Sequence, residues 1–238
     1  MNSLHFLKEV LDFVEKTPEL TGKNCVENKT TYPNPFFGNI ESAQILTVGV
    51  NPSDGESAPS RESNWPADMT RDQPHERLKN YFVSRCPHHC WFDGWIESFR
   101  KLKPGFSYTD GSVAHKDLSP RVTIPMSRVR DKLIFQKMIG ADIEFLFKIL
   151  FESENIRLVM TGGKVLGDKY VAQWIRNCAP SPLILRPAGK GIGATSLYQF
   201  SGLNREVWLF SCGVSPRFRE QLLKNVSENR GALIEFLS

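Results

Sequence analysis

The sequence predicts an α/β fold, a three-layer sandwich in which helices cover a central, mostly parallel sheet. Apolar, β-branched stretches alternate along the chain with amphipathic stretches of helical period, which is the element order of parallel-sheet proteins. The stretch 45–50 is almost entirely apolar, as expected of a strand buried on both faces. The chain has 238 residues without an internal repeat or a linker-like stretch, so we expect one domain over 1–238.

The spacing of apolar residues and the positions of chain-breaking residues such as proline define the expected elements along the chain. Residues 3–16 place apolar side chains at helical spacing and predict an amphipathic helix. The strand at 45–50 must stop at Pro52, which cannot continue a ladder, and a polar loop follows over 52–70. The later expected elements are short helices at 72–83 and 92–101, a strand at 112–118, a core helix at 129–152, a strand at 156–161, a helix at about 164–177 and a strand at 205–211.

The last strand leads into a helical C-terminus. Ser215 is a favourable N-cap residue and Pro216 is favourable at the first helical position, so a helix is expected to begin there. The N-terminus of such a helix favours anions, including a phosphate group.

Bulk properties exclude some classes of protein. The formal net charge of +4 permits nucleic-acid binding without demanding it. No stretch has the length of a membrane span and residues 1–5 do not resemble a secretory signal, so we expect a cytoplasmic monomer without a membrane partner. The odd number of cysteines, five, indicates a reducing compartment and free thiols.

Three strands are each followed by a polar cluster that contains proline, at 49–53, 116–120 and 213–217. Open α/β sheets bind their ligands at the carboxyl ends of strands, so the clusters are candidates for one cleft. Asn51, held at the end of a central strand, could position a water or a substrate. The plainer alternative is that Asn51 only caps a turn of its own backbone.

The order and spacing of these clusters resemble the uracil-DNA glycosylase superfamily. The first cluster is similar to the Gly-x-Asn-Pro-Gly motif of the mismatch-specific (thymine or uracil) and single-strand-selective branches. The resemblance implies that Asn51 positions the water that attacks the sugar, with Gly49, Pro52 and Ser53 beside the substrate.

The third cluster resembles the superfamily's His-Pro-Ser-Pro-Arg loop, which wedges into the duplex and stabilises the flipped nucleotide. Ser215, Pro216 and Arg217 match this loop, and the resemblance implies that they contact DNA. Gly213 and Val214 replace the His-Pro pair, which removes a donor to the base and opens space at Gly213.

The second cluster resembles the His-Asn-Leu-Cys-Pro stretch of the single-strand-selective branch, whose Asn reads the uracil edge. Lys116 stands at the His position and Asp117 at the Asn position. An ionised Asp only accepts hydrogen bonds and suits the exocyclic amino group of cytosine, and a protonated one could also donate to N3. We therefore expect a cytosine-derived base, enlarged by a modification. The alternative is that Asp117 only pairs with a neighbouring Lys or Arg.

Other candidates complete the predicted site. A flipped base usually stacks on an aromatic ring, and Trp65 is the first choice over Phe36, Phe37 and Tyr81, any of which could be core. Lys190, in the glycine-rich stretch 186–193, could contact phosphate, and a solvated hairpin loop is the equal alternative. Ligands crowded into 86–90 cannot all reach one tetrahedral ion, so neither a metal nor a cofactor is expected.

The sequence thus predicts a monofunctional DNA glycosylase. It would flip a modified or mismatched pyrimidine from double-stranded DNA, cleave the N-glycosidic bond and leave an abasic site. The setting would be DNA repair or antiviral defence against phage DNA with modified cytosine. The alternatives are a non-catalytic module of the same fold that binds nucleic acid or a modified base, and a nucleoside or nucleotide hydrolase.

Overall fold

The computed structural model describes residues 1–20, 33–50, 52, 73–84, 89–102, 105–124, 129, 131–163, 186–188, 195–200, 203–212 and 215–237. The chain divides into two compact units. Unit 1 contains Met1–Glu41, Gly49–His88 and His115–Ser153, and unit 2 contains Ser42–Val48, His89–Ala114 and Glu154–Ser238. The expectation of a single domain stays a prediction.

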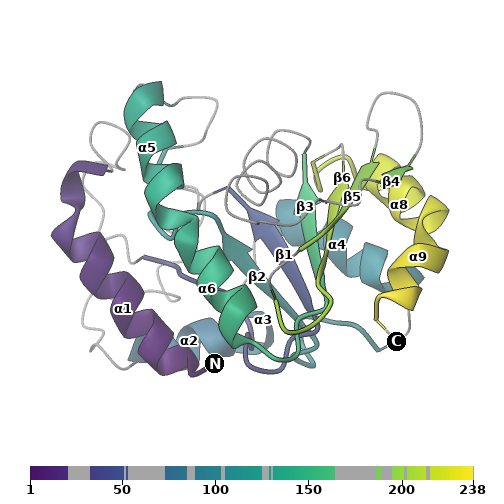
Figure 1. Cartoon of the computed structure of the whole chain (residues 1–238), viewed down its shortest axis with the longest axis horizontal. Helices are drawn as coiled ribbons and strands as arrows, with labels where there is room; N and C mark the ends of the chain where they lie inside the picture. Colours follow the sequence, from purple (N-terminus) through teal and green to yellow (C-terminus); the bar gives the residue numbers. More distant parts are fainter. Residues whose placement is uncertain are drawn as a thin grey trace. The chain divides into compact units, whose positions relative to one another are not determined.

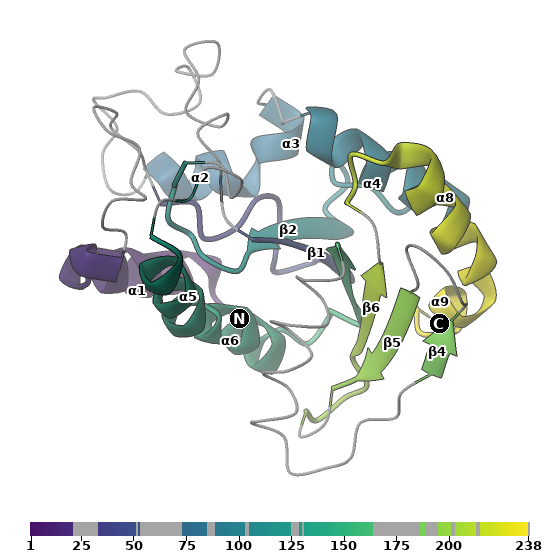
Figure 2. The same ribbon diagram turned by 90° about the horizontal axis from the view of Figure 1, so that it is seen from above.

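The described strands form a six-stranded sheet in the order β2-β1-β3-β6-β5-β4 (Figures 1 and 2). Their bounds are β1 Ile45–Gly49, β2 Val113–Asp117, β3 Leu158–Gly162, β4 Arg186–Ala188, β5 Thr195–Gln199 and β6 Trp208–Cys212. β1 pairs with β3 and β3 with β6 in parallel, whereas β5 runs antiparallel to both β6 and β4.

β2 runs parallel to β1. The Gln44 N–H donates to the Ser112 carbonyl at 2.8 Å before the strands, and the Leu118 N–H donates to the Gly49 carbonyl at 2.9 Å after them. The four strands β2, β1, β3 and β6 are therefore parallel, which confirms the predicted α/β class with a mostly parallel sheet. The predicted strands at 45–50, 112–118, 156–161 and 205–211 correspond to β1, β2, β3 and β6.

The antiparallel pair β4–β5 is a part of the sheet that the sequence pattern did not predict. Figure 2 shows β6, β5 and β4 side by side. Ala188 of β4 lies opposite Thr195 of β5, so the glycine-rich stretch 186–193 begins in a strand, and its residues 189–193 lie outside the described residues.

Register aligns the carboxyl ends of the parallel strands in unit 2. Val48 lies opposite Thr161, and Gly162 lies opposite Cys212. All five residues of β1, β3 and β6 are buried, as their apolar sequences predict.

Unit 1 carries the helices that surround the amino-terminal segment. Their bounds are α1 Ser3–Lys16, the short 3-10 helix η1 Pro18–Leu20, α2 Gln73–Lys79, α3 Tyr81–Ser84, α5 Lys132–Asp142 and α6 Glu144–Glu152. α1 has the predicted range 3–16. It begins after Asn2, because the Asn2 side chain caps the helix by accepting the His5 N–H at 3.0 Å. Its apolar face buries Phe6 against Phe36, with ring centroids 6.3 Å apart.

The prediction of one long core helix over 129–152 was wrong. α5 ends at Asp142 and α6 begins at Glu144. Ile143 between them keeps helical dihedrals, φ −62° and ψ −26°, so the break is slight and apolar spacing alone does not reveal it. The break coincides with Asp142, whose buried carboxylate is bound by groups from outside the helix. The helix expected at 72–83 likewise divides at Asn80 into α2 and α3.

Unit 2 packs its helices against one another (Figure 1). α4 His89–Leu102 contacts both α8 Arg219–Glu228 and α9 Arg230–Glu235. An ion pair joins Arg219 to Glu97, and Nε of Arg230 donates to the Lys101 carbonyl at 2.9 Å. Within the described segments, no helix is both long enough and apolar enough to cross a membrane.

Candidate functional site

The predicted site residues fall into three groups. Five of them lie outside the described residues, namely Asn51, Ser53, Trp65, Lys190 and Gly213. Gly49, Pro52 and Asp117 belong to unit 1, and Ser215, Pro216 and Arg217 belong to unit 2. The helix predicted at about 164–177 also lies outside the described residues.

The carboxylate of Asp117 lies against the backbone of Gly49. Asp117 ends β2 and Gly49 ends the neighbouring β1. A Cβ atom on residue 49 would lie 2.0 Å from Oδ1 of Asp117 and 3.3 Å from Cε1 of His115. Gly49 is therefore required for a close approach, as its sequence context predicts, and the approaching group is a side chain of β2.

Backbone hydrogen bonds join the first polar cluster to the second within unit 1. The Leu118 N–H donates to the Gly49 carbonyl at 2.9 Å and the Ser119 N–H to the Val50 carbonyl at 3.0 Å. The Thr123 N–H donates to the Pro52 carbonyl at 3.3 Å. Both sequence neighbours of Asn51 are thus bound to the segment that directly follows Asp117.

Asp117 is a buried carboxylate with an unused acceptor. Its side chain is 9% exposed, and Oδ1 lies 3.4 Å from Nε2 of His115. Among the described residues, no group donates a hydrogen bond to Oδ2. Oδ2 is not one of the fully buried side-chain atoms that lack a hydrogen-bond partner, so it is accessible from outside. A ligand N–H can therefore donate to Oδ2.

His115 is the residue of this site that the sequence reasoning missed. It is 2% exposed, and its ring stacks on Phe37 with centroids 5.9 Å apart and planes at 28°. The backbone N–H of His115 donates to the Phe37 carbonyl at 2.8 Å, and the backbone carbonyl of His115 accepts the Phe37 N–H at 2.7 Å. Strand alternation could have identified it, because residues two apart in β2 share a face.

The aromatic residues considered as base-stacking platforms are core residues where they are described. Phe36 and Tyr81 are 0% exposed and Phe37 is 3% exposed. Phe37 packs on Tyr81, with centroids 4.5 Å apart, as well as on His115. None of the three offers a face to a flipped base, and Phe37 instead supports the imidazole.

Lys116 points to the opposite face of β2 and is fully buried. Its Nζ donates to the backbone carbonyl of Asp117 at 2.8 Å. Burial lowers the pKa of Lys116 to about 8, although the charges of Asp142 and Asp117 act in the other direction. The ammonium group therefore supports the chain at Asp117 and is not directed to the solvent.

Asp142 is the partner of the neighbouring cation, Arg121. Nε of Arg121 donates to Oδ2 of Asp142 at 3.1 Å, and the Ser119 hydroxyl donates to the same oxygen at 2.5 Å. Burial raises the pKa of the Asp142 carboxyl, while Ser119 and Arg121 lower it in part. Arg121 pairs with Asp142, so it is not the partner of Asp117. The charge of Lys116 does act on Asp117, and the alternative in which Asp117 only pairs with a neighbouring Lys stays open. The side chain closest to the Asp117 carboxylate among those given is His115.

Pro216 of the third cluster is held between two glycines of unit 2. A Cβ on Gly162, the last residue of β3, would lie 2.3 Å from Cδ of Pro216. A Cβ on Gly94 of α4 would lie 2.4 Å from the Pro216 carbonyl oxygen. Pro216 is buried, so the turn that contains it is fixed to the sheet and to α4.

The predicted helix start at Ser215 was wrong. α8 begins at Arg219, and Phe218 precedes it without a side-chain cap. Residues 215–218 form a turn, in which the Phe218 N–H donates to the Ser215 carbonyl at 2.9 Å. The packing of Pro216 against Gly162 and Gly94 fixes this turn and delays the helix, and that packing depends on distant segments.

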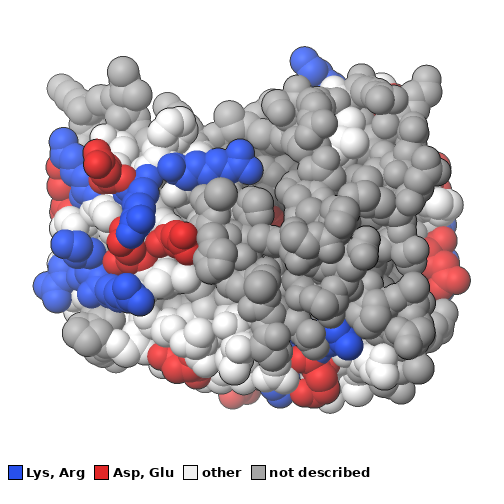
Figure 3. All heavy atoms as spheres, turned by 180° about the vertical axis from the view of Figure 1, so that it is seen from behind, with Lys and Arg blue, Asp and Glu red and all other residues white. Residues whose placement is uncertain are grey.

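The turn presents two exposed side chains, Arg217 and Phe218. Phe218 is 67% exposed and was missed by the sequence reasoning. Figure 3 shows Lys and Arg side chains interspersed with Asp and Glu on the side of the view where α4 and α8 lie. The exposed basic residues of α4, the turn, α8 and α9 are Arg100, Lys101, Arg217, Arg219, Lys224 and Arg230.

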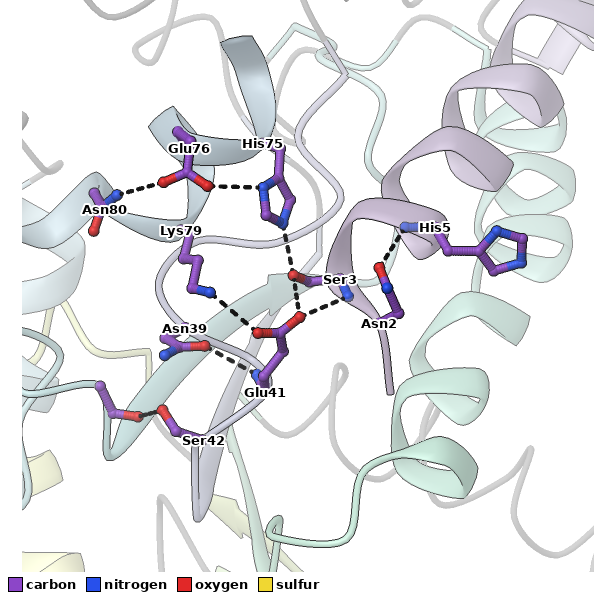
Figure 4. A network of polar contacts seen from close by, with 11 residues as sticks. Asn2, Ser3, His5, Asn39, Glu41, Ser42, His75, Glu76, Lys79 and Asn80 are labelled. Atoms are coloured by element: carbon purple, nitrogen blue, oxygen red, sulfur yellow. Dashed lines mark hydrogen bonds and ion pairs between the residues drawn. The ribbon is translucent and has the colours of Figure 1, made fainter. Parts of the chain in front are cut away.

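A second polar network in unit 1 has the appearance of a serine triad (Figure 4). The Ser3 hydroxyl lies 2.7 Å from Nε2 of His75, and Nδ1 of His75 lies 3.2 Å from Glu76. However, Ser3 is 1% exposed and its hydroxyl is also 2.7 Å from Oε1 of Glu41. We interpret the network as a clasp that fixes the start of α1.

Glu41 is the charged centre of this clasp. Burial raises its pKa, but hydrogen bonds from the Ser3 N–H and hydroxyl and from Lys79 outweigh burial and bring the pKa to about 2. Nζ of Lys79 lies 3.1 Å from Oε2. The carboxylate thus stays ionised over the range in which proteins normally work.

No cluster of three or more His, Cys, Asp or Glu side chains suited to a metal ion occurs among the described residues. The side chains of the candidate ligands at 86–90 lie outside that part of the chain. No family model and no curated protein matches the sequence.

Proposed function

We propose that the protein is a monofunctional DNA glycosylase with a three-layer sandwich fold similar to that of the uracil-DNA glycosylase superfamily. It flips a modified or mismatched pyrimidine out of double-stranded DNA and hydrolyses the N-glycosidic bond. The observation that carries the proposal is the buried carboxylate of Asp117, which lies over Gly49 with Oδ2 accepting no hydrogen bond among the described residues.

The chemistry of that oxygen indicates the class of base. An ionised carboxylate only accepts hydrogen bonds, whereas the amide of Asn both accepts and donates. The exocyclic amino group of cytosine donates at the place where uracil carries the O4 acceptor. A cytosine derivative therefore offers Asp117 the amino group as a donor, whereas uracil offers only N3–H and brings its O4 acceptor close to the carboxylate. Modified cytosines of phage DNA are the substrates we favour, with antiviral defence as the role.

Asn51 is proposed to hold the attacking water. Its neighbours Val50 and Pro52 are bound to Ser119 and Thr123, in the segment that follows Asp117. This supports a position of Asn51 near the base-reading carboxylate. The water oxygen bonds to C1′ of the deoxyribose, the C1′–N bond breaks, and its electron pair leaves with the base. One water proton passes to the base and one remains as the sugar hydroxyl of the abasic site.

The turn 215–218 is proposed to contact the DNA, as the motif resemblance implies for Ser215, Pro216 and Arg217. Pro216 is fixed between Gly162 and Gly94, so Arg217 stands on a rigid support. Phe218 beside it is an exposed apolar ring of the kind that fills a gap in a base stack. Lys190 is proposed as a further phosphate contact.

The test is mass spectrometry of bases released from duplex DNA, with thymine and uracil mismatches, plain cytosine and phage DNA containing modified cytosine as substrates. The wild type should release a modified or mismatched pyrimidine and leave abasic sites. Asn51→Ala should lower the rate by about 100-fold or more. The matched control, Asn204→Ala, changes an exposed asparagine and should keep the wild-type rate.

Each rival function has its own result in the same assay. Binding to modified duplex without release of any base would show a binding module. Release from free nucleosides and not from duplex DNA would show a nucleoside hydrolase. Either result would overturn the proposed function.

A further inference from the structure

We propose that Asp142 is a positioning residue of the reaction, because it holds the segment 117–123. This segment carries the base-reading carboxylate of Asp117 and binds the backbone on both sides of Asn51. The consequence for base release rests on the proposed function; the hold of Asp142 on the segment does not.

The carboxylate of Asp142 binds the segment at two residues. The Ser119 hydroxyl donates to Oδ2 at 2.5 Å, and Nε of Arg121 donates to the same oxygen at 3.1 Å and to Oδ1 at 3.4 Å. The Ser119 hydroxyl in turn accepts the backbone N–H of Arg121 at 3.2 Å. None of the three residues is more than 2% exposed. A satisfied buried polar network of this kind makes the chain that contributes to it rigid.

Ser119 connects the Asp142 carboxylate to the chain before Asn51. Its hydroxyl binds Asp142, and its backbone N–H donates to the Val50 carbonyl at 3.0 Å. Asp117 precedes Ser119 by only two residues in the chain. A displacement of Ser119 is therefore transmitted both to the base-reading side chain and to the residue that precedes Asn51.

Arg121 anchors the segment to a second helix, α1. Its Nη1 donates to the Thr17 carbonyl at 2.9 Å and its Nη2 to the Thr17 hydroxyl at 2.5 Å, at the C-terminal end of that helix. Its guanidinium carbon lies 5.7 Å from the centre of the Phe13 ring. Two residues later, the Thr123 N–H donates to the Pro52 carbonyl at 3.3 Å. The segment is thus fixed to α5 through Asp142 and to α1 through Arg121.

Asp142 is not the residue that stability alone would favour at this position. Aspartate is a weak helix former, and Asp142 is the last residue of α5. Burial raises the pKa of its carboxyl, because removal of the charge from water is unfavourable. Apolar side chains often replace a buried ion pair without loss of stability. The geometry that Asp142 imposes on Ser119 and Arg121 therefore explains its presence better than its contribution to stability does.

A paired substitution separates the position of the segment from the stability of the fold. Asp142→Leu together with Arg121→Met, the paired variant, replaces the ion pair by apolar side chains and leaves no unpaired buried charge. Asp142→Asn keeps an oxygen for the Ser119 hydroxyl and should fall between the paired variant and the wild type. The matched control is Glu9→Leu with Lys148→Met, which removes the 2.6 Å ion pair between α1 and α6 in the same unit.

Amide hydrogen exchange measures the hold on the segment and requires no activity. The Ser119 and Thr123 amides should exchange at least about 10-fold faster in the paired variant than in the wild type, while the amides of β3 keep their rates. The control should keep the wild-type rates at all of these amides. Urea unfolding shows whether each variant folds. If the paired variant does not fold, Asp142→Asn and Ser119→Ala decide the matter by the same exchange rates.

Base release from the duplexes described above measures the consequence for the reaction. The paired variant should lower kcat by about 10- to 100-fold, because a small displacement of reacting groups has effects of this size. The Kd for duplex DNA should stay nearly unchanged, because the turn 215–218 carries no substitution. Asp142→Asn should recover part of the lost kcat. A purely structural defect would instead reduce the folded fraction, and with it binding and turnover together.

The two proposals fail in different ways. A wild type that releases no base overturns the proposed function, and the exchange rates of Ser119 and Thr123 then still decide whether Asp142 holds the segment. Exchange of both amides at the wild-type rate in every folded Asp142 variant overturns this inference, whatever the DNA assay gives. An unchanged kcat in those variants, with an active wild type, also overturns it.

Discussion

The carboxylate of Asp117 occupies the space where a side chain on residue 49 would begin, with Oδ1 2.0 Å from that Cβ position. The polar cluster at 49–53 and the polar cluster at 116–120 are far apart in the sequence. They can pack together because residue 49 has no side chain.

Gly49→Ala should displace Asp117 and abolish base reading while the fold persists. The new methyl group must push the carboxylate away, and overpacking of this kind costs about 1–3 kcal/mol. Urea unfolding gives the loss of stability, and base release gives the loss of activity. Gly140→Ala is the matched control, because nothing lies within 4 Å of its Cβ position. Equal activity in Gly49→Ala and wild type would contradict the close approach.

Gly162→Ala should disturb the turn 215–218. The Cβ would meet Cδ of Pro216 at 2.3 Å, and a proline ring in a fixed turn has little room to move. We expect a stability loss of about 1–3 kcal/mol and weaker duplex binding, measured by urea unfolding and fluorescence anisotropy. Gly231→Ala, at an open helical position, should instead be neutral or stabilising. Wild-type stability and affinity in Gly162→Ala would show that Pro216 does not anchor the turn.

Lys116 should give the protein a stability that rises with pH in alkaline solution. Its pKa in the folded state is about 8 and in the unfolded chain about 10.5. Between these values the unfolded chain binds more protons, so the free energy of unfolding increases with pH. The rise attributable to this group is at most about 3 kcal/mol. Lys116→Met should remove it; parallel curves for variant and wild type would contradict the low pKa.

Glu41 should contribute in acid solution with a dependence of the same sign, because its pKa is also lower in the folded state than in the unfolded chain. Its pKa falls from 4.5 to about 2 on folding, so its contribution is complete above 4.5 and is lost as the pH drops through about 2. Glu41→Gln should flatten the acid limb of the stability curve, measured by thermal unfolding. Glu206→Gln, at an exposed position, serves as control. An acid limb unchanged by Glu41→Gln would show that the clasp at Ser3 adds no stability.

Local sequence signals account for much of the fold. The range of α1 follows from apolar spacing and the Asn2 cap, and β1, β3 and β6 follow from their apolar runs, whereas β2 has a weaker apolar pattern. β4 and β5 gave no such pattern, because a short hairpin strand is defined by its partner. The division of α5 from α6 was not predicted either, because the backbone dihedral angles of Ile143 remain helical.

The candidate site was predictable only where one residue carries its own signal. Gly49 and Asp117 were identified from strand ends and motif resemblance, and the structure brings them together. His115 was missed because its residue type inside a strand does not by itself indicate a functional role, and only its alternation with Asp117 on one face of β2 could have identified it. The turn before α8 was mistaken for a helix start because the packing of Pro216 comes from Gly94 and Gly162, which are remote in sequence.

The most direct test of the account is the identity of the bases released by wild type and by Asp117→Asn from the same duplexes. Asp110→Asn, at an exposed aspartate, is the matched control and should behave as wild type. The account predicts that the wild type releases a cytosine derivative in preference to uracil. Asp117→Asn should lose that release by about 100-fold and either turn toward uracil or become inactive. Efficient uracil excision by the wild type, without release of any modified cytosine, would contradict the central claim.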